Sequence, residues 1–168
     1  MSKNLSEWNK GDSWHTTDDV VMGGISSSSF TVQKSGTGIF EGNVSLENNG
    51  GFSSLKGEIP ENGFSGFSGI RFKARGDGKK YKLYVKDHNQ PGGINYQYEF
   101  MAESGISKIY SCPFSEFIPV SKGKLVTAAS SLESDKIRFM GFIIANRQNG
   151  NFKLEIEWIE GYKENSHV

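Results

Sequence analysis

The chain has 168 residues, a length typical of one domain with its own hydrophobic core. Basic and acidic side chains both number 19, so the formal net charge of +0 argues against nucleic acid or an anionic membrane as a partner. With 21 glycines, 4 prolines and 12% aromatic residues, the composition indicates a folded domain rich in tight turns, and we expect one domain over residues 1–168.

Alternation of apolar and polar residues predicts β-strands along most of the chain. In residues 152–160, for example, Phe152, Leu154, Ile156 and Trp158 fall on one face and are expected in the core. The same period of two occurs at residues 40–46, 69–75, 80–86 and 94–100. Residues 137–145 are apolar on both sides, which is typical of a central strand covered on both faces.

Signals for helices are sparse. Short helical turns are predicted at residues 115–117 and within residues 125–134. Residues 117–135 form the longest irregular segment, and segments of this length are often functional. About eight to ten strands without intervening helices predict an all-β fold, an antiparallel β-sandwich of the jelly-roll kind.

Residues 18–56 carry the most unusual composition. Two loop-like clusters, residues 18–24 and 47–51, each place acidic or amide side chains beside a Gly-Gly pair. Their oxygen-bearing side chains are Asp18, Asp19, Asn48 and Asn49. Such side chains either cap turns beside the glycines or hold a ligand, and both interpretations stay open. A calcium site needs 6–8 oxygen ligands, and these residues supply only part of a set, so no metal or cofactor is predicted.

Motifs for catalysis are missing from the sequence. The three histidines, His15, His88 and His167, have no second histidine at ligand spacing, and there is no HExxH, GxSxG, P-loop or paired CxxC. The one cysteine, Cys112, lies among apolar neighbours, which favours an inert buried thiol over a nucleophile. We therefore expect a protein that is not an enzyme.

Basic side chains recur in two neighbouring predicted strands. If both strands expose their polar faces together, one basic surface results, interleaved only by Tyr84. Its members would be Arg71, Lys73, Arg75, Lys80, Lys82 and Lys86. The turn between the strands contains Arg75-Gly76-Asp77, and the spacing predicts a hairpin there rather than an adhesion motif.

The N-terminal residues lack the 7–15-residue apolar core of a secretory signal, and no segment approaches the ~20 apolar residues of a membrane span. The sequence thus predicts a cytoplasmic protein without membrane insertion.

Several segments resemble the complex I intermediate-associated protein family, the assembly-factor domain of NADH:ubiquinone oxidoreductase. The resemblance rests on DDVVMGGISSSSF, GIFEGNVSLENNGGFSSLK and GIRFKARGDGKKYKL, followed by YQYEF, PFSEFIP and FKLEIEWI. It implies a galactose-binding-like jelly roll and a non-enzymatic role. The matching motif residues are Asp19, Met22, Gly23, Gly24, Ser26, Glu47, Asn48, Asn49, Gly50, Gly51, Phe52, Arg71, Gly76, Asp77, Gly78 and Tyr81.

The sequence departs from the family pattern at Lys56, at residues 121–124 and at Asn146, where Arg, Arg-Gly-Arg and Asp are common. Lysine does not replace the bidentate contacts of arginine, so an anion contact is less supported. As a chain without a transit peptide, it resembles compact bacterial members of the family.

The sequence leads to one principal hypothesis, a binding or assembly module, in the manner of a chaperone, for a protein partner such as a respiratory-complex subunit. The alternative is a carbohydrate- or small-ligand-binding module, with Tyr84 and Trp14 as aromatic candidates; an enzyme using Asp19 and Asn49 is a third possibility. The candidate contact residues are Asp18, Asp19, Asn48, Asn49, Arg71 and Tyr84. The candidate structural residues are Met22, Gly23, Gly24, Gly50, Gly51 and Phe52.

Overall fold

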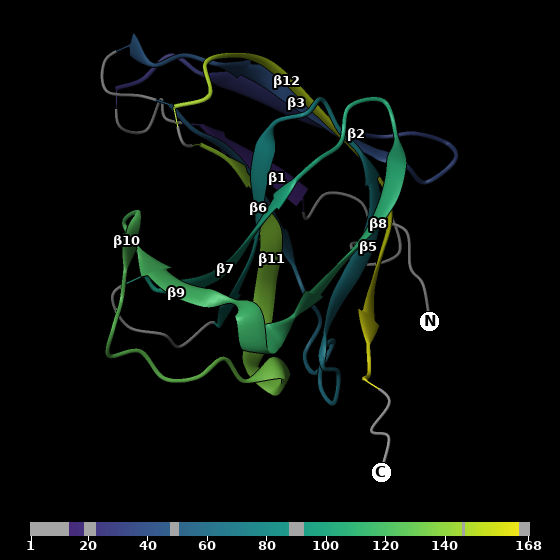
Figure 1. Cartoon of the computed structure of the whole chain (residues 1–168), viewed down its shortest axis with the longest axis vertical. Helices are drawn as coiled ribbons and strands as arrows, with labels where there is room; N and C mark the ends of the chain where they lie inside the picture. Colours follow the sequence, from purple (N-terminus) through teal and green to yellow (C-terminus); the bar gives the residue numbers. More distant parts are fainter. Residues whose placement is uncertain (1–13, 19–22, 48–50, 88–92, 146, 165–168) are drawn as a thin grey trace.

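A computed structural model describes residues 14–18, 23–47, 51–87, 93–145 and 147–164 (Figure 1). Within these ranges the chain forms twelve strands and two 3₁₀ turns. The strands are β1 (Trp14–Asp18), β2 (Ser27–Val32), β3 (Gly38–Val44), β4 (Ser53–Glu58), β5 (Gly69–Arg75), β6 (Lys80–Asp87), β7 (Asn95–Met101), β8 (Ser107–Pro113), β9 (Ile118–Ser121), β10 (Lys124–Leu125), β11 (Ile137–Ile144) and β12 (Gly150–Tyr162). The turns are η4 (Phe114–Glu116) and η5 (Ser134–Lys136).

The strands form two sheets. The seven-stranded sheet has the order β1-β4-β11-β6-β7-β9-β10, and the five-stranded sheet has the order β2-β3-β12-β5-β8. All the neighbouring strands named here pair in the antiparallel sense. This arrangement confirms the prediction of an all-β, antiparallel jelly-roll sandwich.

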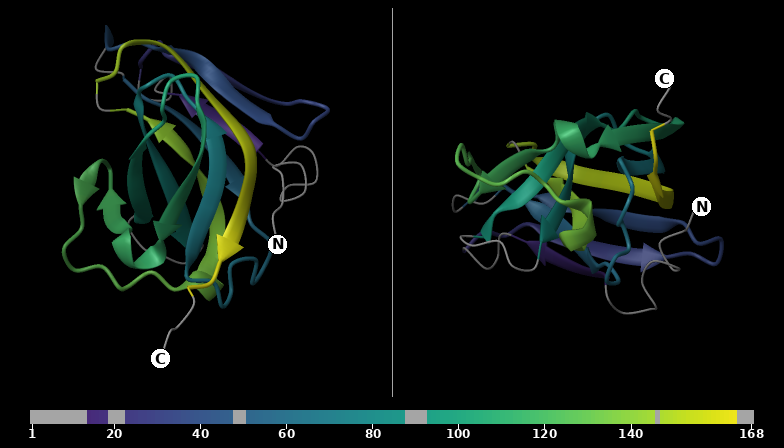
Figure 2. Two further views of the ribbon diagram at one scale, coloured as in Figure 1. Left: turned by 45° about the vertical axis from the view of Figure 1, so that its right-hand side comes forward. Right: turned by 90° about the horizontal axis from the view of Figure 1, so that it is seen from below.

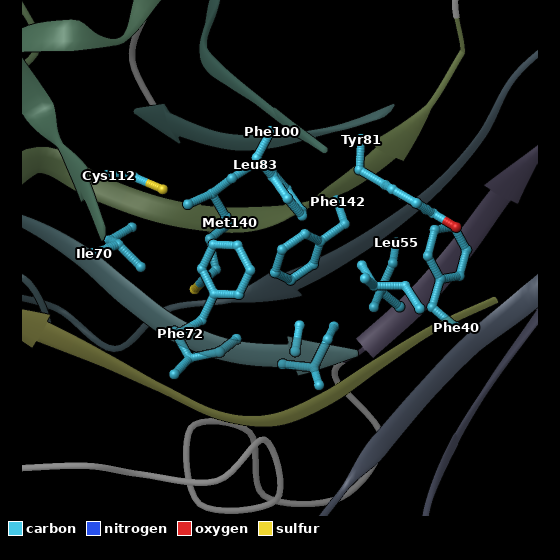
Figure 3. Packing of buried hydrophobic residues seen from close by; sticks show 14 of the residues in the cluster. Phe40, Leu55, Ile70, Phe72, Tyr81, Leu83, Phe100, Cys112, Met140 and Phe142 are labelled. Atoms are coloured by element: carbon cyan, nitrogen blue, oxygen red, sulfur yellow. The ribbon is translucent and has the colours of Figure 1, made fainter. Parts of the chain in front are cut away.

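The core lies between the two sheets, and aromatic rings fill its centre. Phe72 of β5 lies edge-on to Phe100 of β7, with ring centroids 4.9 Å apart, and edge-on to Phe142 of β11 at 5.3 Å (Figure 3). Such edge-to-face pairs add to the roughly 1.5–3 kcal/mol that burial of each large apolar side chain contributes. The period-two prediction is confirmed in β5, where Ile70, Phe72 and Ala74 are all buried.

β11 confirms the prediction of a central strand, because it pairs with β4 on one side and β6 on the other. Its core-facing residues are buried, while Phe139 and Ile143 on the opposite face are half-buried. Gly141 is required here, since a Cβ would lie 1.7 Å from the Leu55 carbonyl oxygen and 2.8 Å from Cε1 of Tyr84. The ring of Tyr84 therefore lies against the backbone of β11.

The predicted core position of Trp158 is wrong. The pairing of β12 with β5 shifts register between Ile156 and Trp158, as at a β-bulge. Beyond the shift, Trp158 pairs with Lys73 and is half-buried, while Ile159 is fully buried opposite Phe72. An extra residue at a bulge reverses the alternation of the side chains that follow it, and the sequence pattern gives no sign of this.

The segment Gly76–Gly78 is not a hairpin turn, contrary to the sequence prediction. β5 pairs with β12 and β8, whereas β6 pairs with β11 and β7, so this segment carries the chain from one sheet to the other. Asp77 fixes the crossing. Its carboxylate accepts hydrogen bonds from the Lys79 N–H at 3.1 Å, the Tyr81 hydroxyl at 2.9 Å and the Lys153 N–H at 2.9 Å. Tyr81 belongs to one sheet and Lys153 to the other.

The two helical predictions differ in outcome. The turn expected at residues 115–117 is present, one residue earlier, as η4. The turn expected within residues 125–134 is absent from residues 126–133, and η5 begins only at Ser134. In the part of the chain that the structure describes, no helix is long and apolar enough to span a membrane.

We predict that Asp77→Ala lowers the free energy of unfolding by about 2–4 kcal/mol, since it leaves charge-assisted donors of both sheets without an acceptor. Urea denaturation followed by tryptophan fluorescence measures the change. The matched control is Asp135→Ala, because Asp135 is exposed on a turn. Equal midpoints for the two variants would show that the Asp77 bridge is dispensable.

Candidate functional site

Described residues next to the two glycine-rich clusters are joined by hydrogen bonds. Ser26 is buried, and its hydroxyl accepts a hydrogen bond from the Ser45 N–H at 2.9 Å and donates to the Ser45 carbonyl at 3.3 Å. These contacts join the segment before β2 to the segment after β3. Gly23, with φ of 91°, and Gly51, with φ of 132°, adopt backbone conformations that favour glycine.

Asp18 has a structural role within the described residues. Its carboxylate accepts hydrogen bonds from the Ser28 N–H at 3.1 Å and from the Ser28 hydroxyl at 2.5 Å. The contact joins β1 of the seven-stranded sheet to β2 of the five-stranded sheet. Gly24 is buried and Phe52 is half-buried. Asp19, Met22, Asn48, Asn49 and Gly50 lie outside the described residues, so their proposed roles stay predictions.

A shallow pocket of about 550 Å³ lies near this end of the five-stranded sheet. Its polar lining is occupied by contacts within the chain: Asn43 Nδ2 donates to Asn151 Oδ1 at 2.9 Å, and Asp77 is used as described above. The oxygen-rich surface here therefore serves the architecture of the sandwich.

The predicted basic surface does not exist as one surface, because β5 and β6 belong to different sheets. The basic residues of β5 pair with the glutamates of β12. Arg71 Nη2 lies 2.7 Å from Glu160, Lys73 lies 3.5 Å from Glu157 and Arg75 lies 3.9 Å from Glu155. Arg71 also lies over the ring of Tyr162 at 5.5 Å. This half of the predicted surface is neutralised by its neighbouring strand.

The lysines of β6 are in a different situation. Lys80, Lys82 and Lys86 point away from the core, on the outer face of the seven-stranded sheet. Among the described residues, none of their ammonium groups has an ion-pair partner. We call these three residues the lysine stripe.

Tyr84 lies within the lysine stripe, and the prediction of an exposed ring is wrong. Its side chain packs across Gly141 and only 7% of Tyr84 is exposed. Burial raises the pKa of its hydroxyl above the ordinary value, so the group stays protonated. In the described part of the chain this hydroxyl has no hydrogen-bond partner.

Beside the lysine stripe, the outer face contains a hollow of about 260 Å³. It is lined by Lys82, Gln97, Glu99, Ile118, Val120, Gly123 and Leu125. Ile118 and Leu125 are 51% and 62% exposed, high values for large aliphatic side chains. Val120 is buried outside the main core, and Gln97 Nε2 donates to Asn95 Oδ1 at 2.8 Å.

The hollow is formed by the β9–β10 hairpin, which stands at one margin of the molecule (Figure 2). The tight turn between these strands uses Lys122 and Gly123, with φ of 51° and 77°. Register aligns Tyr84 with Gln97 and Gln97 with Ile118, so these side chains form one row across β6, β7 and β9. Sequence reasoning missed Ile118 and Leu125 because β9 and β10 are too short for a periodic pattern; only the length of the irregular segment gave a signal.

No group of three His, Cys, Asp or Glu side chains that could hold a metal ion occurs in the described ranges. Cys112 is fully buried, and burial, with a further contribution from Glu116, raises the pKa of its thiol to about 12. Of the described surfaces, the hollow combines exposed aliphatic side chains with Lys82, whose ammonium group forms no ion pair among the described residues.

Solved structures show the class of fold. The family 11 carbohydrate-binding module of the cellulosomal cellulase Lic26A-Cel5E of Clostridium thermocellum matches with a TM-score of 0.70 at 20% identity and covers 99% of this chain and 98% of that chain. The agarase AgWH50C matches with a TM-score of 0.64 at 10% identity, over 98% of this chain and 25% of that chain. At these identities the likeness shows the fold alone, a galactose-binding-like jelly roll.

The family described as Complex I intermediate-associated protein 30 matches residues 4–156, and the chain belongs to this family. An uncharacterized protein of Schizosaccharomyces pombe is 30% identical, over 92% of this chain and 82% of that protein. The mitochondrial complex I intermediate-associated protein 30 of Mus musculus is 24% identical, over 94% of this chain and 54% of that protein. A probable counterpart in Caenorhabditis briggsae is 26% identical, over 99% and 53%.

The expectations of a cytoplasmic protein and of a likeness to bacterial members are contradicted. The relatives from Mus musculus and Caenorhabditis briggsae are named as mitochondrial proteins. The chain spans about half the length of these mitochondrial relatives. The composition of residues 1–14 carries no information about the compartment of the family.

We predict that Asp18→Ala lowers the free energy of unfolding by about 1–3 kcal/mol, because the Ser28 N–H and hydroxyl lose their acceptor. Asp18→Asn keeps one acceptor oxygen and should lose less. Thermal denaturation compares the variants. If Asp18→Ala left stability unchanged but abolished partner binding, Asp18 would belong to a binding site instead.

We predict that Cys112 resists iodoacetamide in the folded protein at neutral pH, because its raised pKa keeps the thiol protonated and the core excludes the reagent. Mass spectrometry should show full modification only after urea is added. Rapid native modification would contradict the burial of this thiol.

Proposed function

We propose that the chain is a non-enzymatic protein-binding module that assists assembly of NADH:ubiquinone oxidoreductase, and that the outer face of the seven-stranded sheet is its binding surface. Membership of the complex I intermediate-associated protein 30 family supports the assembly role. The observation that supports the surface is the pair of half-exposed aliphatic side chains, Ile118 and Leu125, around a hollow next to the lysine stripe.

The other faces are less suited to a partner. On the outer face of the five-stranded sheet, the basic residues of β5 pair with acidic residues of β12, so a partner there would have to replace existing ion pairs. On the seven-stranded sheet, a partner gains contacts without breaking such pairs. Burial of Ile118 and Leu125 would contribute roughly 25 cal/mol per Å² of apolar area removed from water.

Carbohydrate binding is supported by the fold alone. Sugar sites commonly use an exposed aromatic ring beside polar groups. The two aromatic candidates from the sequence, Tyr84 and Trp14, are only 7% and 8% exposed, so neither ring offers a stacking surface. The hollow is bordered instead by aliphatic side chains, which favour a protein segment.

A photocrosslinker tests the proposed surface. p-Benzoylphenylalanine at Leu125 should crosslink in cells to a subunit or an assembly intermediate of the respiratory complex, and mass spectrometry should identify the crosslinked segment. The control position is Ser29, which is exposed on β2 of the other sheet.

Leu125→Asp should fail to restore assembly of the complex in a strain lacking the protein, as judged by native electrophoresis, whereas Ser29→Asp should restore it. Leu125 is exposed on a two-residue edge strand, so its substitution should leave the melting temperature nearly unchanged. Normal assembly without the protein, or equal crosslinking from both positions, would rule out the proposed function.

A further inference from the structure

We propose that the outer face of the seven-stranded sheet binds an extended segment of the partner that carries an acidic side chain over Tyr84, between Lys82 and Lys86, and an aliphatic side chain in the neighbouring hollow. This inference rests on the proposed function and adds the chemistry of the partner. It follows from the separation of two sets of basic residues, from the hydroxyl of Tyr84 and from the shape of the hollow.

Charge distinguishes the two outer faces. On the five-stranded sheet, each basic residue of β5 forms an ion pair with a glutamate of β12. On the seven-stranded sheet, Glu99 lies opposite Lys82 in register, but the lysine stripe forms no ion pair among the described residues, and Lys56 on β4 contacts the ring of Phe139 at 4.8 Å. The acidic residues that point outward from β4 and β7 are Glu58 and Glu99. This face therefore has an excess of positive charge although the whole chain is neutral, and it complements an acidic segment.

Tyr84 offers a donor on this face. The ring is buried, yet its hydroxyl makes no hydrogen bond within the described residues and is not sealed from solvent. Water therefore satisfies the hydroxyl in the free protein, and a ligand oxygen would replace that water as its acceptor. Lys82 and Lys86 lie two residues to either side on the same face of β6. A carboxylate above Tyr84 would accept a hydrogen bond from the hydroxyl and lie between two ammonium groups.

The spacing of the strands suits an extended segment. Tyr84, Gln97 and Ile118 occupy one row across three neighbouring strands. Neighbouring strands are about 4.8 Å apart, so the Cα atoms of Tyr84 and Ile118 are roughly 10 Å apart. In an extended segment, residues two or four positions apart share a face and lie roughly 7 or 13 Å apart, and the length of the side chains covers the difference. A peptide with this spacing fits the surface.

Shape favours a peptide over a membrane surface. Ile118, Val120 and Leu125 line a hollow, and the Tyr84 ring lies against Gly141. A flat lipid surface is contacted best by side chains that project outward, whereas a hollow accepts a side chain from a segment that crosses it. Anionic lipid is the competing outcome that the experiment must separate.

The test selects peptides that bind the protein from a display library of linear peptides, and the affinity of the enriched sequences is then measured. Enriched peptides should contain Asp or Glu two or four residues from Leu, Ile or Val. The double variant Lys82→Met, Lys86→Met should weaken binding by about 10-fold or more, and Tyr84→Phe by about 3- to 10-fold. Raising the ionic strength should weaken binding to the wild type more than to the double variant.

Lys34→Met is the matched control, because it removes an exposed lysine in the turn between β2 and β3, remote in register from the row. Its affinity should equal that of the wild type. Melting temperatures establish that each variant folds. If the double variant is unfolded, Lys82→Gln alone provides the same comparison.

Enriched peptides without an acidic residue, or equal affinity for all variants, would overturn the inference. It would also fail if the protein bound vesicles of phosphatidylcholine with cardiolipin through the lysine stripe but no peptide. The crosslink from Leu125 separates the two proposals. A crosslinked partner segment without carboxylates would reject this inference and leave the proposed function standing. If no partner were crosslinked, the proposed function itself would be rejected.

Discussion

The Asp77 carboxylate accepts three hydrogen bonds at the point where the chain leaves the five-stranded sheet and enters the seven-stranded sheet. The contact with Tyr81 holds β6, and the contact with the Lys153 N–H holds β12. A carboxylate satisfies donors from both sheets without adding volume to the core. The crossing places the basic residues of β5 beside the glutamates of β12 and the lysines of β6 on the other sheet, where they form no ion pair among the described residues. The charge of each outer face therefore depends on this crossing.

The two outer faces differ for this reason. Glutamates of β12 neutralise Arg71, Lys73 and Arg75, which makes the outer face of the five-stranded sheet a set of cross-strand ion pairs. The other face keeps its lysines, a recessed tyrosine and a hollow closed by a short hairpin. Glycine at position 141 makes the recess possible, because a side chain there would displace the Tyr84 ring. One strand, β11, thus contributes buried side chains to the core on one face and the glycine beneath Tyr84 on the other face.

The glycine-rich segment around residues 18–51 is part of the same architecture. Asp18 joins β1 to β2, and Ser26 joins the segments that flank β2 and β3, so the described part of this family motif holds the sandwich together. Ligand contacts by Asp19, Asn48 and Asn49 remain a prediction. The surface proposed for the partner lies on other strands, those of the seven-stranded sheet.

Local chemistry was sufficient for much of the fold. Period-two alternation determined the strands β5 and β6 and their core faces. The apolar run at residues 137–145 determined a central strand. The sequence motifs and their order along the chain identified the family. These features depend on neighbouring residues in the chain, so a sequence carries them directly.

Tertiary structure decided the rest. Strand pairing decides whether β5 and β6 share a sheet. A register shift decides whether Trp158 faces the core, and a glycine on the neighbouring strand decides whether Tyr84 is exposed. Ile118 and Leu125 line one hollow because strand pairing places β9 beside β7 and β10 beside β9. Such contacts join residues far apart in sequence, and local alternation contains no record of which strand will be the neighbour.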